Sequence, residues 1–366
     1  MSRCLTSSVV NGADVVRYVT VTGRLVPHTP EDFMKLIRLA RDFRRAVVYA
    51  TRMIVKKLDR NEVLRELRSM LNKAYGDSAY KVAKALVKGA KFNGGDPRRI
   101  EVKRLFIVNG GEASRLGNRN VRLESTDTVK VKYPHDGSWL TFRACFGEEY
   151  LPLVSELVEL ARARKASYGA RMIFRSGRVY LHLSIPVELC LKHFRRGEAR
   201  GNLAAGFDLN SDRINMVIVD RYGRIRDVKT AWFPEVTSHG FPRNKAKARR
   251  LEALAKLFEY AYYHGVGTVV FENLLAIKHR RYVRSPTANR KIAKFAKREL
   301  LQHAIVSAMK YGFKVLLIDP RGTTRSREHD ETMRKHGLDS HAASAYLIAL
   351  RGIEGYRKYN LRFQPT

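Results

Sequence analysis

The segment AAGFDLN, residues 204–210, decides the fold of the second half of the chain. Its small and apolar residues predict a buried strand, and Asn210 marks the turn that follows. Two more segments rich in β-branched residues come directly after it, INMVIVD (214–220) and RIRDVKTAWF (224–233). We therefore expect three consecutive strands, with one aspartate, Asp208, inside the first of them.

Beyond these strands the pattern alternates between helix and strand. The expected elements are a basic helix, the strand TVVFENL, a second helix, the strand KVLLIDP and a last helix, at 243–263, 268–274, 288–311, 314–320 and 339–351. Three strands followed by alternating helices and strands is the element order of an RNase H-like mixed α/β sheet.

The first half of the chain shows a different pattern. A strand or short hairpin at 14–26 precedes helices at about 29–58, 61–75 and 77–91, and the breaker FNGGDP ends the helical stretch. Strands then return between about 100 and 190, with one helix at about 150–165 and a hairpin turn at Ser176-Gly177. The basic segment 193–203 has few core residues and is the expected domain junction.

Charge limits the classes of partner. The chain has 366 residues, of which 70 are Lys or Arg and 35 are Asp or Glu, giving a net charge of +35. Such an excess favours a polyanionic partner, nucleic acid above all, rather than a small-molecule substrate. No run of about 18 apolar residues and no continuous apolar signal core is present, so we expect a cytoplasmic protein without a membrane partner.

Three carboxylates are the candidate catalytic and metal-binding residues. Asp208 lies in the first strand, Glu272 ends an apolar strand, and Asp339 begins the small-residue helix LDSHAASAYLIAL. Two-metal phosphodiester hydrolysis needs several carboxylates that converge from distant strand ends, because the cations must be held about 4 Å apart. The expected cofactor is therefore Mg²⁺ or Mn²⁺.

Each carboxylate also has a structural interpretation. Asp208 is compatible with a turn cap, Asp339 with an ordinary helix N-cap, and Glu272 with a salt bridge to a basic neighbour. Asp330 and Glu331 fall in the polar segment SREHDETMRKHG, which reads as a loop, and are the substitute ligands if Asp339 points away.

Clusters of basic residues are the candidate nucleic-acid contacts. They are Arg243, Lys245, Lys247, Arg249 and Arg250 in the 243–263 helix; Lys278, Arg280, Arg281 and Arg284, interleaved with Tyr282; and Arg41, Arg44 and Arg45 on the first helix. Lys and Arg neutralise phosphates, and an aromatic ring stacks on a base. A solvated helix face is the competing explanation.

The segments GFDLN, VVFENL, KVLLIDPRGTT and LDSHAASAYLIAL, in this order, resemble TnpB (OrfB) proteins of insertion sequences. These are RNA-guided nucleases related to type V CRISPR effectors. The likeness covers residues 201–352 well. It implies that Asp208, Glu272 and Asp339 match the three RuvC motifs, and that guide RNA and target DNA are the partners.

The resemblance also implies a domain layout. A β-barrel-like wedge domain would occupy 1–28 and 98–195, a helical recognition domain 29–97, and a RuvC (RNase H-like) nuclease domain 201–366. Two departures from the family stand out: His341 replaces a common Asn and is a possible accessory residue, and the two CxxC knuckles are missing. The three cysteines, Cys4, Cys145 and Cys190, lie far apart, so we expect no zinc.

The expected function is RNA-guided DNA endonuclease of a transposon, a metal-dependent hydrolase. Three alternatives stay open: a guided DNA-binding regulator with weak or no cleavage, an unguided RuvC-like structure-specific nuclease, and a transposase. The missing knuckles favour the regulator, and the three carboxylates favour the nuclease.

Overall fold

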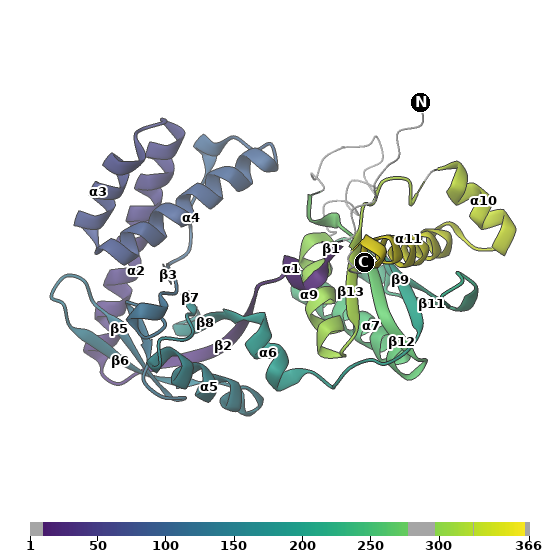
Figure 1. Ribbon diagram of the computed structural model, residues 1–366. Helices are drawn as coiled ribbons and strands as arrows, with labels where there is room; N and C mark the ends of the chain where they lie inside the picture. The colour runs from purple at the N-terminus through teal and green to yellow at the C-terminus, as the bar shows by residue number, and fades with distance from the viewer. Residues whose placement is uncertain (1–9, 277–296, 325, 363–366) are drawn as a thin grey trace. The chain divides into compact units, whose positions relative to one another are not determined.

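The computed structural model describes residues 10–276, 297–324 and 326–362. The chain divides into two compact units, an N-terminal unit (Tyr18–His193) and a C-terminal unit (Met1–Arg17 with Phe194–Thr366). Both sheets and helices contribute to each unit (Figure 1), so the prediction of a mixed α/β protein is confirmed.

The C-terminal unit is built on a six-stranded mixed sheet in the order β1-β13-β12-β9-β10-β11. Its strands are β1 (Val10–Asn11), β9 (Leu203–Leu209), β10 (Arg213–Val219), β11 (Ile225–Trp232), β12 (Val266–Glu272) and β13 (Lys314–Ile318). β10 is antiparallel to both β9 and β11, whereas β12 is parallel to β9 and β13. All five strands expected from the sequence in this half are present.

Helices cover both faces of this sheet (Figure 1). They are α7 (Arg243–Tyr263), α9 (Lys297–Lys310) and α11 (Ser340–Arg362), with the single-turn α1 (Gly12–Val15) beside β13, and α10 (Arg327–His336) packs on α11. Phe258 of α7 packs edge-on against Phe207 of β9 and Phe271 of β12 on one face. The aromatic side chains thus fix α7 on the face opposite Gly206 and Val270, because neighbouring residues of a strand point to opposite sides.

The small residues of α11 explain how closely it lies on the other face. A Cβ added to Gly206 of β9 would lie 2.1 Å from the carbonyl oxygen of Ala345, and one added to Gly352 would lie 2.5 Å from Val270. The buried cluster between them is made of Ala204, Val217, Val219, Ala342, Ala345, Tyr346 and Ala349. The close contact brings the first turn of α11 to the end of β9, next to Asp208.

The prediction of a loop after β13 is wrong. The segment SREHDETMRKHG forms α10 instead of a loop. Ser326 caps its start by accepting from the backbone N–H of His329, and Gly337 ends it with a φ of +63°. The helix has no continuous apolar stripe, which is why its periodicity was not apparent from the sequence.

The N-terminal unit contains a seven-stranded antiparallel sheet in the order β3-β7-β8-β2-β6-β5-β4. Its strands are β2 (Tyr18–Pro27), β3 (Phe106–Asn109), β4 (Val121–Leu123), β5 (Thr128–Lys132), β6 (Trp139–Cys145), β7 (Gly169–Arg175) and β8 (Arg178–Pro186). The β7–β8 turn has positive φ at both Ser176 and Gly177, so the predicted hairpin is confirmed.

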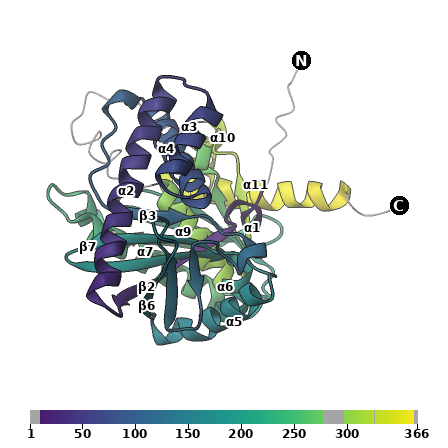
Figure 2. The same ribbon diagram turned by 90° about the vertical axis from the view of Figure 1, so that its left-hand side faces the viewer.

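Five helices belong to this unit: α2 (Pro30–Val55), α3 (Arg60–Met70), α4 (Lys73–Phe92), α5 (Leu151–Arg162) and α6 (Val187–Phe194). Thr29 caps the start of α2, since its Oγ1 accepts from the Asp32 backbone N–H at 3.1 Å. Helices α2, α3 and α4 lie side by side (Figure 2) and bury Leu36, Phe43 and Leu67. No described helix has the length and apolar character needed to cross a membrane.

Short 3-10 helices complete the structure at Pro97–Arg99, Ala113–Arg115, Glu148–Tyr150, Pro234–Thr237 and Leu274–Ala276. Residues 29–97 cluster with the seven-stranded sheet in one compact unit, and Val10–Asn11 pair with β13 of the C-terminal unit. The assignment of wedge, recognition and nuclease domains stays a prediction.

Candidate active site

Asp208 and Glu272 lie next to each other at the ends of two parallel strands. Phe207 of β9 is paired with Phe271 of β12, and the two carboxylate residues occupy the next position on each strand. They share the face that carries Gly206 and Val270, which is the face that α11 covers. The register therefore places two acidic residues from segments 64 positions apart at the same edge of the sheet.

Asp208 is held by two polar side chains. It is 8% exposed, and its Oδ2 accepts from Nδ2 of Asn210 at 2.7 Å and lies 3.0 Å from Nδ1 of His341. Asn210 Nδ2 also lies 3.1 Å from that same Nδ1. The hydrogen bond to Asp208 raises the pKa of His341, against the opposing effect of burial. The first turn of α11 thus contacts the carboxylate at the end of β9.

Glu272 contacts the loop that follows β13. The hydroxyl of Thr323 donates to its Oε1, and Thr323 is fully buried. Neither Thr323 nor Asn210 was among the candidate site residues predicted from the sequence. The only sequence signal was indirect: both stand in segments that carry the resemblance, directly after a predicted strand.

Asp339 caps the start of α11. Its Oδ1 accepts from the backbone N–H groups of His341 and Ala342, both at 2.8 Å. This is the helix N-cap role that its position allowed, and it fixes the residue at the same helix terminus as His341. Asp339 and Asp208 are therefore linked through His341.

The donor types fit a hard divalent cation, since carboxylate oxygens are the ligands that Mg²⁺ and Mn²⁺ prefer. Asp208 and Glu272 lie on the same face of the sheet and at equivalent positions of neighbouring strands. This places both carboxylates where they could bind one cation. Across residues 10–276, 297–324 and 326–362, however, no three His, Cys, Asp or Glu side chains are grouped closely enough to hold a metal. The three-carboxylate centre stays a prediction.

The basic residues of α7 differ in their surroundings. Arg243 and Lys247 are ion-paired with Glu299, and Arg249 with Glu252 and Glu235. Lys245 is exposed. Arg250 is buried and donates to the carbonyl of Ser211 at 3.0 Å, and burial lowers its pKa. The guanidinium of Arg250 therefore braces the turn after β9.

On α2, Arg41 is exposed, Arg44 donates to the carbonyl of Val102 at 2.6 Å, and Arg45 pairs with Asp42 at 3.4 Å. The second predicted cluster, Lys278, Arg280, Arg281, Tyr282 and Arg284, lies outside the described residues.

A basic surface that the sequence pattern did not reveal lies on the seven-stranded sheet. The alternation of the strands directs eight Lys and Arg residues to the face opposite the buried core: Arg24, Arg122, Lys130, Lys132, Arg143, Arg171, Arg175 and Arg178. We call these eight residues the basic sheet face. Within the part of the chain that the structure describes, none of the eight pairs with a carboxylate. In sequence, these basic residues occupy outward positions of alternating strands, most clearly Lys130 and Lys132 of β5.

Aromatic rings accompany these charges. The guanidinium of Arg122 lies 4.4 Å from the ring centroid of Trp139, and Nζ of Lys132 lies 5.1 Å from the same ring. His182 is on this face too, and its pKa is lowered by burial and by the positive charges of Arg171 and Arg175. Burial is the larger cause of the lowered pKa, and the two arginines add a smaller electrostatic part.

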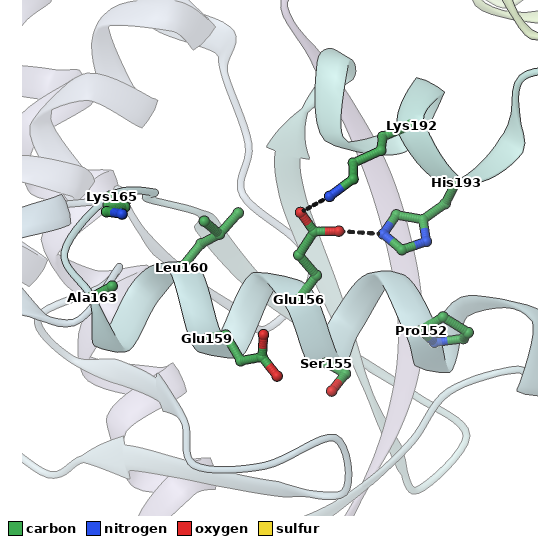
Figure 3. Close-up of a pocket in the computed structure, with 9 residues that line it drawn as sticks. All are labelled: Pro152, Ser155, Glu156, Glu159, Leu160, Ala163, Lys165, Lys192 and His193. Carbon is green, nitrogen blue, oxygen red and sulfur yellow. Dashed lines mark hydrogen bonds and ion pairs between the residues drawn. The ribbon is translucent and has the colours of Figure 1, made fainter.

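A separate open pocket of about 590 Å³ lies between α5 and α6 of the N-terminal unit (Figure 3). Glu156 at its wall pairs with Lys192 at 2.6 Å and with His193 at 2.8 Å. The hydrogen bond from Lys192 lowers the pKa of Glu156. No predicted site residue lines this pocket, and the ion pairs connect α6 to α5.

Comparison with solved structures finds low overall similarity. The chain aligns with "T. thermophilus RuvC in complex with Holliday junction substrate" at a TM-score of 0.30 and 18% identity, over 43% of this chain and 96% of that one. It aligns with "Crystal structure of the Cas12i1 R-loop complex after target DNA cleavage" at a TM-score of 0.16 and 9% identity, over 77% of this chain and 31% of that one.

Comparison with known sequences is more informative. Residues 18–195 match the family model "SSO2105 N-terminal domain", with bounds close to those of the N-terminal unit. "Uncharacterized protein SSO2105" of Saccharolobus solfataricus is 39% identical over 93% of both chains. An "Uncharacterized protein" of Aeropyrum pernix is 30% identical over 78% of this chain and 81% of its own length. The chain belongs to the SSO2105 family.

Proposed function

We propose that this protein is a RuvC-like, metal-dependent DNA endonuclease that is guided by RNA, as in TnpB proteins. The observation that carries the proposal is the juxtaposition of Asp208 and Glu272 on adjacent parallel strands, with the Asp339 end of α11 linked to Asp208 through His341. The strand order β13-β12-β9-β10-β11, with β10 alone reversed, is typical of RNase H-like sheets and supports this assignment.

In this proposal Asp208, Glu272 and Asp339 hold Mg²⁺ or Mn²⁺. When bound, the cations lower the pKa of a water molecule and stabilise the charge on the phosphate. The protein orients the carboxylates: Asn210 and His341 hold Oδ2 of Asp208, and Thr323 holds Oε1 of Glu272. Such supporting contacts fix the orientation of metal ligands and raise affinity for the ion.

The proposed partners are guide RNA and target DNA. The net charge of +35 favours binding to a polyanion, and the basic sheet face offers unpaired charges to phosphates. Sequence recognition by base pairing would leave the protein to hold the nucleic acid by backbone charge and shape. Lys245 and Arg41 are further exposed candidates.

The test is to express the chain with its native flanking DNA, extract any RNA that co-purifies, and incubate the complex with Mg²⁺ and DNA that matches the RNA. We expect cleavage by the wild-type complex and none by Asp208→Ala, which should still bind RNA. Cleavage retained by Asp208→Ala would exclude the assigned site. Absence of RNA together with cleavage of branched DNA would favour an unguided nuclease.

Three observations favour a second candidate, a guided DNA-binding regulator. The His341 ring contacts the Asp208 carboxylate, and the Asp339 carboxylate accepts hydrogen bonds as a helix N-cap. Among the described residues, no three His, Cys, Asp or Glu side chains are grouped closely enough to hold a metal. In the same experiment a regulator would hold matched DNA in the presence of Mg²⁺ without cutting it.

A further inference from the structure

The loop between β13 and α10 has few residues but many hydrogen bonds. Thr323 is fully buried in it, and its Oγ1 lies within hydrogen-bond distance of Glu272 Oε1 and 2.8 Å from the carbonyl oxygen of Pro320. The backbone places Thr323 Oγ1 beside the Pro320 carbonyl, and its single proton is available to the carboxylate of Glu272, so the position of Thr323 restricts where Oε1 of Glu272 lies.

Helix α11 holds this loop through Arg351. The guanidinium donates to the carbonyls of Arg321 at 2.6 Å and Gly322 at 2.9 Å, and to Oε2 of Glu328 at 2.8 Å. Gly322 has a φ of +73°, a conformation that favours glycine and turns these carbonyls toward α11. The residue before Thr323 is therefore tied to the same helix whose first turn contacts Asp208.

A second tie joins the first turn of α11 to α10. Nε2 of the buried His329 lies 2.8 Å from the carbonyl oxygen of Ser340 and 3.3 Å from Oγ of Ser344. Ser344 Oγ is in turn 3.4 Å from Oγ1 of Thr324. A hydrogen-bonded path thus runs from Glu272 through Thr323 and Thr324 to the turn of α11 that begins at Asp339.

We infer that Thr323 is a positioning residue for Glu272, and that α11, through Arg351 and Ser344, holds it in register with the Asp208–His341 contact. A glutamate side chain has three rotatable bonds, so a fixed donor on one oxygen removes much of its freedom before a cation arrives. Both carboxylates are connected to α11 by hydrogen bonds. The packing of α11 on the sheet therefore determines how far apart the carboxylate oxygens of Asp208 and Glu272 lie. The inference rests on the proposed function, since it assigns a role at the same site.

The experiment compares Thr323→Val, which keeps the shape of the side chain and removes the hydroxyl, with Thr323→Ser, which keeps the hydroxyl. Thr51→Val is the matched control: Thr51 is also buried and donates to a backbone carbonyl, that of Val47 at 2.7 Å, in the N-terminal unit. Mn²⁺ binding to the purified full-length chain is measured by titration calorimetry, and thermal unfolding is measured without metal.

We expect Thr323→Val to bind Mn²⁺ roughly ten-fold more weakly, at the lower end of the range for removal of a group that supports a metal ligand. Thr323→Ser should recover most of that affinity, and Thr51→Val should match the wild type. In cleavage assays Thr323→Val should need correspondingly more Mg²⁺ for half-maximal rate while the rate at saturating Mg²⁺ changes less.

Wild-type affinity in Thr323→Val would overturn the inference and leave the nuclease proposal intact. If Thr323→Val unfolds far below Thr51→Val, the serine variant decides: affinity like the wild type supports positioning by the hydroxyl, and weakened affinity overturns it. Wild-type protein that binds no Mn²⁺ would refute both the proposed function and the inference.

Discussion

The two sheets of this protein differ in where they carry acidic residues. In the N-terminal unit, none of the seven described strands contains Asp or Glu. In the C-terminal unit, three strand residues are acidic, Asp208, Asp227 and Glu272. An acidic residue within a strand costs free energy when it is buried without a partner, so its presence needs a physical reason.

The physical reason differs between these three acidic strand residues. Asp227 is on the edge strand β11, where the hydroxyl of Tyr260 donates to it. Asp208 and Glu272 lie side by side on central strands, where their like charges repel. The cation of the proposed active site would offset this repulsion. The strands of the N-terminal sheet, by contrast, contain no acidic residue, and among the residues that the structure describes none of the eight residues of the basic sheet face forms an ion pair with a carboxylate.

The largest expected effect is on cleavage, when Glu272 is changed to Gln. The substitution keeps the size of the side chain and removes its charge, so weaker cation binding should reduce the cleavage rate by about 10²-fold or more. The control is Asp227→Asn, the other acidic strand residue with a hydroxyl partner, which should cleave like the wild type. If both variants lose the same fraction of the cleavage rate, Glu272 has no role in cleavage that Asp227 lacks.

The next effect concerns binding by the basic sheet face. Replacing Arg24, Lys130 and Arg143 by Gln should weaken binding of a labelled single-stranded RNA roughly ten-fold at low salt. The slope of log K against log salt should fall by about 0.7 for each phosphate that the variant no longer neutralises. Fluorescence anisotropy at several salt concentrations measures both quantities.

The matched control removes the same charge from residues that are already paired. Lys35, Arg68 and Arg119 form ion pairs with Asp136, Asp77 and Glu112. Their replacement by Gln should weaken RNA binding less and leave the salt slope nearly unchanged. If both triple variants behave alike, net charge alone determines binding, and the basic sheet face has no special role.

A smaller effect concerns stability and compares one glycine in each unit. Gly206→Ala places a Cβ 2.1 Å from the carbonyl oxygen of Ala345, so it should destabilise the C-terminal unit by about 1–3 kcal/mol. Gly89→Ala on α4 meets no atom within 4 Å and should stabilise its helix by roughly 0.5–1 kcal/mol. Denaturant unfolding measures both changes. A neutral Gly206→Ala would mean that α11 does not pack closely against β9.

The smallest effect is the pH dependence contributed by His182. Burial and the charges of Arg171 and Arg175 lower its pKa below the ordinary value. At a pH above the unfolded-state pKa both states are neutral and His182 has no effect on stability. As the pH falls through that value, the unfolded state takes up a proton that the folded state resists, so stability decreases until the folded-state pKa is reached.

Bound polyanion should reduce this shift, because phosphates offset the part that Arg171 and Arg175 contribute while the part due to burial remains. NMR titration of the imidazole should therefore give a low pKa for the free protein and a higher one in the presence of RNA. His182→Gln should remove this part of the pH dependence of unfolding. An unchanged His182 pKa with bound RNA would place the RNA elsewhere.

Much of the C-terminal unit was predictable because its signals are local. Apolar strands such as 204–210 and 214–220, and the basic helix 243–263, were expected close to the bounds that the structure shows. Helix α10 was missed because its stability comes from the Ser326 cap and its packing on α11 rather than from an apolar stripe. Local pattern carries little information about such a helix.

The sequence by itself determined the alternation of elements, the excess of positive charge, and which carboxylates stand at strand ends. Only the tertiary structure decided that β9 and β12 are neighbours in register, that Gly206 lets α11 approach, and that Asn210, His341 and Thr323 contact the carboxylates. It also decided which of the described basic residues form no ion pair, such as those of the basic sheet face. Arg250, in contrast, is buried and hydrogen-bonded to the carbonyl of Ser211. Periodicity along the chain reports which face a residue occupies, whereas partners distant in sequence depend on strand pairing and helix packing.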